Sequence, residues 1–212
     1  MSSMLPPTIP VFPLPNVVLF PSVCLPLHIF EPRYREMVGD ALDGDRMIGM
    51  VLLRPGWEGE YEGRPPIYTV GCAGLITHAD RTDDGRYNIV LRGLHKFRVD
   101  SEDHSRRYRM AAIEPILEPL AESERPAVTA ERRRLEALLV PQPSGRGVDH
   151  TMPPSMPDEE LVNALAQYLD LEVVEKQALL ERNGLIERCR SLIELLEMKM
   201  LSAHHSWGVG KH

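Results

Sequence analysis

The sequence predicts an α+β fold, with a β-rich first part over residues 1–120 and a helical second part over residues 121–203. Short apolar segments broken by prolines and glycines dominate the first part, and this pattern is typical of strands and turns. Further along the chain, apolar residues recur at the spacing of amphipathic helices. The 212 residues, 43% of them hydrophobic, suffice for one large domain or two small ones.

The first part opens with strands and one helix. Segment 9–14 (IPVFPL) predicts a short edge strand, because its prolines cannot donate to a central ladder. Segments 17–20 and 24–30 predict strands around a turn at Pro21. Pro32 suits a first helical position, and apolar residues then follow at helical spacing to about residue 42.

Longer strands complete the first part. Segment 47–53 (MIGMVLL) is apolar throughout, as in a strand covered on both faces. Further strands are predicted over 67–78, 86–99 and 108–117, with a hairpin turn at Asp83-Asp84-Gly85. Glycines recur inside these strands and indicate bulges or close backbone approaches, so a strongly coiled sheet or a small barrel is predicted.

The second part predicts a helical bundle. Helices are predicted over 128–140, 158–169 and 172–182, and a last helix carries an apolar stripe from Leu185 to Met200. The proline- and glycine-rich segment 141–157 predicts a mobile loop, and residues 204–212 a flexible tail.

The charge and the cysteines restrict the partners and the compartment. The net charge is −7, with −3 up to residue 120 (13 basic minus 16 acidic residues) and −4 beyond it (11 minus 15). Neither part is a polycation, so we do not expect nucleic-acid binding, despite the basic run at 106–109. Cys24, Cys72 and Cys189 are isolated and are expected to be buried thiols. Without a signal-like or membrane-spanning segment, a cytoplasmic location with no membrane contact is expected.

Motifs for catalysis and metal binding are absent from the sequence. No Walker A, GxSxG, HExxH or GxGxxG pattern occurs, and no serine has the context of a Ser–Lys dyad. His204, His205 and His212 could chelate a metal, but a flexible tail offers no second shell. We therefore predict no catalytic residues, no metal site and no cofactor.

Several motifs in order resemble those of one family. The first is IPVFPL at 9–14 with VVLFP at 17–21 and LPLHIFEPRY at 25–34. The second is VGCAGLI at 70–76, and the third is DGRYNIVLRG at 84–93 followed by Phe97-Arg98-Val99. The helical segments 161–169, 175–181 and 192–196 also match. Over residues 8–200 the chain resembles the N-terminal substrate-binding domain of Lon proteases.

The resemblance implies a fold and a role. It implies a twisted, PUA-like β-barrel carrying one helix, followed by a helical bundle, and a role in recognising unfolded or damaged polypeptides for a protease. Full-length Lon continues into an AAA+ motor and a Ser–Lys peptidase, for which no residues follow His212. We therefore expect a free-standing, non-catalytic adaptor or chaperone-like module, and leave open a separate protease as its partner.

Three residues are candidates for polypeptide contact. Glu31 and Arg33 lie in the most family-like segment, where the alternative is that they cap and pair locally. Trp57 lies in a Gly/Glu-rich loop that favours exposure, whereas Phe20 and Phe30 are expected in the core. Two other functions stay open at this point: a small-ligand or RNA-binding PUA-like module, and an unassigned hydrolase.

Overall fold

The computed structural model describes residues 5–60, 63–139 and 156–208, with side chains up to residue 202. These residues form two compact units, which we describe separately. The first unit contains the residues up to Leu117 together with Asn163–Glu181, and the second contains Glu118–Val162 and the residues from Arg182 onward. Within the described residues, no helix is long and apolar enough to cross a membrane.

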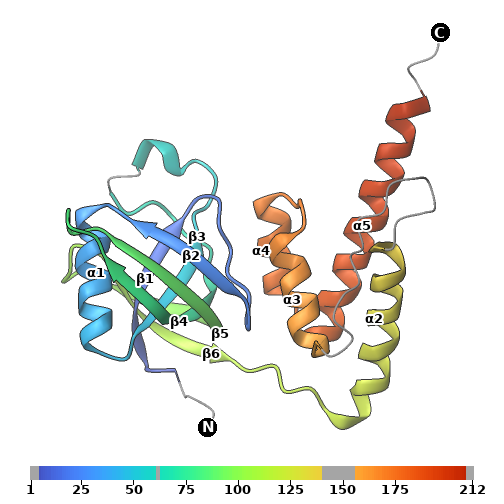
Figure 1. Ribbon diagram of the computed structural model, residues 1–212, viewed down its shortest axis with the longest axis horizontal. Helices are drawn as coiled ribbons and strands as arrows, with labels where there is room; N and C mark the ends of the chain where they lie inside the picture. The colour runs from blue at the N-terminus through green and yellow to red at the C-terminus, as the bar shows by residue number, and fades with distance from the viewer. Residues whose placement is uncertain (1–4, 61–62, 140–155, 209–212) are drawn as a thin grey trace. The chain divides into compact units, whose positions relative to one another are not determined.

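A six-stranded mixed sheet forms the first unit, as Figure 1 shows. Its strands are β1 (Thr8–Leu14), β2 (Cys24–Ile29), β3 (Met47–Leu52), β4 (Val70–Arg81), β5 (Tyr87–Asp103) and β6 (Arg109–Ile116). Their order is β2-β5-β4-β3-β1-β6, and β5 also pairs with β6. The pairings therefore run in a closed circuit from β5 through β4, β3, β1 and β6 back to β5.

Strand β1 lies inside the sheet, so the predicted edge position is wrong. It pairs in parallel with β3 over 11–14 and antiparallel with β6 over 8–11. The two ladders overlap only at Val11. Pro10 is registered only against β6 and Pro13 only against β3, so each proline has one side on which no donor is needed.

Segment 17–20 is irregular and not a strand, although Val18, Leu19 and Phe20 are buried. Its backbone crosses β5 where a Cβ on Gly93 would lie 2.1 Å from the Phe20 carbonyl oxygen. The Gly93 amide donates to the Val23 carbonyl, and its own carbonyl accepts from Ser22. Gly93 is one of the mid-strand glycines that predict a close backbone approach, and here its lack of a side chain lets the irregular buried segment 17–20 pack against the sheet.

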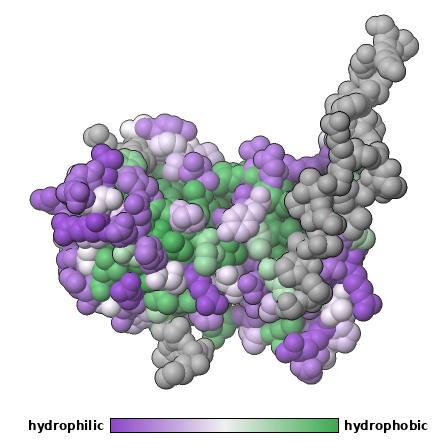
Figure 2. All heavy atoms as spheres, in the orientation of Figure 1, coloured by the Kyte–Doolittle hydropathy of each residue, from purple (hydrophilic) through white to green (hydrophobic). Residues whose placement is uncertain are grey.

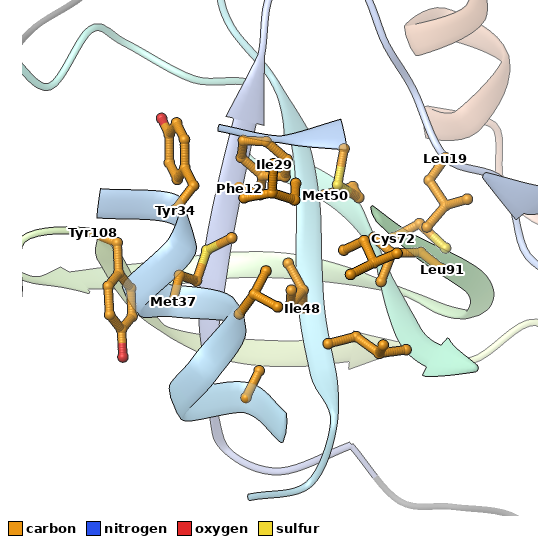
Figure 3. Close-up of a cluster of buried hydrophobic side chains, with 14 residues drawn as sticks. Phe12, Leu19, Ile29, Tyr34, Met37, Ile48, Met50, Cys72, Leu91 and Tyr108 are labelled. Carbon is orange, nitrogen blue, oxygen red and sulfur yellow. The ribbon is translucent and has the colours of Figure 1, made fainter. Parts of the chain in front are cut away.

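The single helix of this region, α1 (Pro32–Asp43), is present as predicted and covers one core cluster. Its buried residues Tyr34, Met37, Val38 and Ala41 belong to this cluster, together with Phe12, Ile48 and Leu91 from the strands. Figure 3 shows the cluster, with Tyr34 and Met37 on α1 and Leu91 farther from the helix. The rings of Phe12 and Tyr34 pack with centroids 4.4 Å apart. The helix is thus fixed by burial of its apolar face.

A second cluster contains Ile9, Val51 and Phe97, with Trp57 packed against it from the 3-10 helix η1 (Trp57–Glu60). Lys96, a charged residue in the middle of β5, is almost fully buried. Gly49 and Gly71 lie against Phe97 of this cluster, and a register shift follows at Cys72/Gly74. The sheet therefore bends where the sequence predicts bulges.

The helices α3 (Asp158–Tyr168) and α4 (Val173–Glu181) supply the last part of the first unit, because Asn163–Glu181 group with the sheet. The Phe20 amide donates to Gln167 Oε1 at 3.3 Å, and Gln177 Nε2 donates to the Val70 carbonyl at 3.0 Å. Both amide side chains therefore satisfy backbone groups of the β region.

In the second unit, α2 (Arg125–Leu139) packs against α5 (Gly184–Gly208). In the basic run at 132–134, Arg132 pairs with Glu136 of its own helix. Arg134 instead pairs with Glu197 of α5, and Glu131 with Arg190 of α5. The run therefore joins two helices as well as facing solvent.

A buried ion pair fixes the start of α5. Arg188, with only 1% of its side chain exposed, donates to Glu118 Oε2 at 2.6 Å. The other carboxylate oxygen accepts from the Gly184 amide at 2.7 Å, where a negative charge also suits the helix dipole. The predicted loop at 141–157 lies mostly outside the described residues, and so do the side chains of the tail at 204–212.

We predict that Gly93→Ala destabilises the protein by about 1–3 kcal/mol, since its Cβ must displace the backbone of Phe20. The midpoint of urea unfolding measures the effect. Gly59→Ala is the control, because a Cβ there meets nothing within 4 Å. Equal midpoints for the two variants would contradict the close approach.

We predict that Glu118→Ala lowers the free energy of unfolding by about 3–5 kcal/mol, because Arg188 loses its buried partner. Glu122→Ala, which removes an exposed pair with Arg125, should cost only about 0–1 kcal/mol. Urea unfolding followed by circular dichroism compares them. If both variants lose the same amount, the Glu118 pair is not buried in solution.

Candidate functional site

The outer face of β2 carries a row of exposed side chains. Cys24, Pro26 and His28 point outward, and Phe30 follows them directly after the strand. Leu25, Leu27 and Ile29 alternate with them and pack against the core. We call Cys24, Pro26, His28 and Phe30 the β2 strip. Figure 2 shows hydrophobic surface over the strands of this face, bordered by hydrophilic surface over α1.

Phe30 is the most unusual member of the β2 strip, because 58% of this large apolar residue is exposed. Its ring stacks on His28, with centroids 6.3 Å apart, and His28 Nδ1 lies 2.8 Å from Asn88 Oδ1 on the neighbouring strand. The expected burial of Phe30 is therefore wrong, whereas that of Phe20 is confirmed. Aromatic side chains supply large apolar contact area in recognition surfaces, which makes Phe30 a candidate contact residue.

The free edge of β2 is only partly able to accept another strand. Among the described strands β2 pairs with β5 alone. Pro26 has no amide hydrogen to donate, and the Cys24 carbonyl already accepts a hydrogen bond from the Tyr168 hydroxyl at 2.8 Å. Side-chain contact with the β2 strip is therefore a better route to binding than addition of a strand.

Glu31 and Arg33 bind each other at the start of α1. Arg33 donates through Nε and Nη2 to Glu31 Oε2, both at 3.0 Å, and its guanidinium stacks over the Tyr34 ring at 4.6 Å. About a fifth of each side chain remains exposed (21% and 22%). The local pairing that the sequence left as an alternative is thus present, and it fixes a charged pair one residue beyond Phe30.

Trp57 is half-buried against the second core cluster instead of standing free in its loop. The three candidates for polypeptide contact thus differ in setting: Glu31 and Arg33 adjoin the β2 strip in sequence, and Trp57 belongs to η1. The strip itself was missed, because the segment CLPLHIF is apolar on both faces and hides the alternation.

Near α1 the hydroxyl of Tyr108 is held as a hydrogen-bond donor. Burial and the hydrogen bond to Asp40 raise the pKa of Tyr108 to about 12, so its hydroxyl stays a donor at neutral pH. Within the part of the chain that the structure describes, no three His, Cys, Asp or Glu side chains are grouped to hold a metal ion. The arrangement offers shape, apolar contact and fixed charge.

These features define a class: an α+β domain with a mixed six-stranded sheet, whose candidate site is a surface of side chains. The chain belongs to the family described as the ATP-dependent protease La (LON) substrate-binding domain, whose model matches residues 8–198. The resemblance in the sequence motifs is therefore confirmed.

The chain is similar to one part of several longer proteins. The chain is 26% identical to Lon protease of Flavobacterium johnsoniae over 201 residues and 29% identical to Lon protease 2 of Myxococcus xanthus over 201 residues. Each alignment covers 92% of this chain and 24% of the relative. The chain thus spans about a quarter of the length of the curated relatives it matches.

Solved structures share the fold. The Lon N-terminal domain protein from Xanthomonas campestris matches with a TM-score of 0.57 and 22% identity, over 88% of this chain and 97% of its own. The N-terminal domain of Mycobacterium avium complex Lon protease matches with a TM-score of 0.60 and 18% identity, over 90% and 98%. The mixed α+β architecture is therefore that of Lon N-terminal domains.

We predict that one of the three cysteines reacts with a thiol reagent in the native state. Cys24 is exposed, so its expected burial is wrong, whereas Cys72 and Cys189 are buried. Burial also raises the pKa of Cys189 to about 11, which disfavours its thiolate. Titration with Ellman's reagent at pH 8 should release one equivalent, and none for Cys24→Ser. Rapid reaction of a second thiol would contradict this packing.

Proposed function

We propose that this chain recognises unfolded or damaged polypeptides and does not cleave them. The observation that carries the proposal is the exposed Phe30 on the β2 strip, followed at once by the Glu31–Arg33 pair. The ring offers apolar contact to an extended chain, and the charged pair lies beside it. Membership of the substrate-binding domain family supports the same role.

Recognition through the β2 strip is expected to be weak and tolerant of sequence. An unfolded chain loses conformational entropy when it is ordered on a surface. A single aromatic contact contributes about 1.5–3 kcal/mol when it is fully buried, so it supports transient binding. This suits an adaptor or a chaperone-like module, which must release what it binds.

The proposal extends to the setting of the domain. We place the chain in the cytoplasm, with unfolded polypeptides and a separate protease as partners. The closed circuit of strand pairings supports a small PUA-like barrel at 1–120, and the packing of α2 on α5 supports a helical bundle within 121–203. These boundaries stay predictions.

We predict that Phe30→Ala weakens binding of an unfolded polypeptide about tenfold, which corresponds to about 1.4 kcal/mol of lost apolar contact. Fluorescence anisotropy with labelled, reduced and carboxymethylated α-lactalbumin measures the affinity. The urea midpoint should be unchanged, because the Phe30 side chain is already exposed.

Val174→Ala is the matched control, since Val174 is also exposed in the first unit but lies on α4. It should bind the unfolded protein as the parent chain does. Equal affinities for the Phe30→Ala variant and the parent would remove the β2 strip from the proposal. Casein incubated with the parent chain should stay intact with and without ATP, and cleavage that survives further purification would refute the non-catalytic role.

A further inference from the structure

A cavity of about 220 Å³ opens beside the first turn of α1 in the first unit. Four arginines line it, Arg33, Arg64, Arg107 and Arg109, together with the rings of Tyr34 and Tyr108. We call this cavity the arginine pocket. The four arginines come from α1, from the segment before β4 and from the start of β6, so three separate parts of the chain bring their positive charges together there.

Two of the four guanidiniums are held rigidly by carboxylates. Arg109, only 6% exposed, donates to both oxygens of Glu102 at 3.1 and 2.9 Å and to the Pro65 carbonyl at 2.5 Å. Arg33 pairs with Glu31 as described above. These contacts preorganise the back of the pocket, since neither side chain has to be ordered when a ligand arrives.

The other two guanidiniums have no carboxylate within ion-pair distance among the described residues. Arg64 donates only to the backbone carbonyls of Asp103 and Arg106, at 3.3 and 3.2 Å. Arg107 is exposed. Counting only side chains that the structure describes, four lining arginines minus the paired Glu31 and Glu102 leave two positive charges at the pocket.

The pKa of Arg109 and the composition of the first turn of α1 are consistent with this positive potential. Burial lowers the pKa of the Arg109 guanidinium, and the nearby charge of Arg64 lowers it further, against the opposing effect of Glu102. No acidic residue occupies the first turn of α1, where a helix end favours negative charge and where Arg33 stands instead. Although the chain has a net charge of −7, four of its arginine side chains lie together around this one cavity.

We propose that the arginine pocket binds a carboxylate carried by a polypeptide, either an acidic side chain or a chain terminus. This inference rests on the proposed function and names a preference within it. Guanidinium groups match the planar, two-oxygen geometry of a carboxylate. The proline, leucine and tyrosine carbons that also line the cavity suit the aliphatic stem of such a group.

The size of the pocket decides between this ligand and larger anions. Sites for drug-sized ligands measure roughly 300–1,000 Å³. A cavity of about 220 Å³ takes one side chain or one terminus and not a whole cofactor. A nucleic-acid strand needs an extended basic groove, whereas the rest of this chain carries an excess of acidic residues.

The test compares two peptides and two double variants. The peptides are acetylated, amidated octapeptides of serine and glycine with a central Glu-Glu or Gln-Gln. The variant Arg64→Gln/Arg107→Gln removes the two charges that no carboxylate pairs. The control Arg92→Gln/Arg98→Gln removes the same charge from exposed positions of β5 that do not line the pocket.

The parent chain should bind the Glu-Glu peptide at least tenfold more tightly than the Gln-Gln peptide by calorimetry at low salt. The Arg64→Gln/Arg107→Gln variant should lose this preference, and the control variant should keep it. All three proteins should bind an acetylated, amidated peptide of phenylalanine, serine and glycine equally, because this peptide has no carboxylate and its binding therefore reports on the β2 strip alone. If the urea midpoint of the Arg64→Gln/Arg107→Gln variant differs from that of the parent chain, the single variants Arg64→Gln and Arg107→Gln replace it in the comparison.

Distinct results overturn the inference. Equal binding of the two peptides by the parent chain, together with binding of α-lactalbumin, rejects the arginine pocket and leaves the proposed function standing. Failure of the parent to bind any polypeptide rejects both. Tighter binding of inorganic phosphate or of a single-stranded RNA oligonucleotide than of the Glu-Glu peptide, lost in the Arg64→Gln/Arg107→Gln variant, would assign the pocket to phosphate instead.

Discussion

The first unit depends on one strand that must pair with three others. Over its 17 residues β5 pairs with β4 along one side, while along the other its first part meets β2 and its last part meets β6. A strand can change partners in this way only if it bends, and Gly93 lies at the change, with the backbone of Phe20 crossing where a side chain would stand. Pairing of β2, and with it the outward row that ends at Phe30, follows from this bend.

The sequence predicts well which segments form the strands, but it predicts less well which strands pair with each other. Strand and helix segments follow from apolar runs, turns and glycines, which are local signals. The interior position of β1 could not be predicted, because it depends on two ladders that overlap at a single residue. The burial of Lys96 and the cross-helix partners of Glu131 and Arg134 depend likewise on contacts distant in sequence.

The candidate site was predicted only in part. Glu31 and Arg33 were singled out by the family-like segment, and the structure places them at the first turn of α1. The exposure of Phe30 was hidden by apolar residues on both faces of β2. The arginine pocket is distributed over positions 33, 64, 107 and 109, so the basic run at 106–109 gave only half of it and no sign of its concave setting.

The contact between Tyr168 and the Cys24 carbonyl has a consequence for how this sheet edge can associate with other chains. A bare sheet edge next to an aromatic surface would template the stacking of partly unfolded chains. Here the Tyr168 hydroxyl binds the Cys24 carbonyl and Pro26 has no amide hydrogen, so fewer backbone groups of that edge can pair with a further strand. Such partial blocking of an edge lowers the tendency of the domain itself to serve as the first strand of an aggregate.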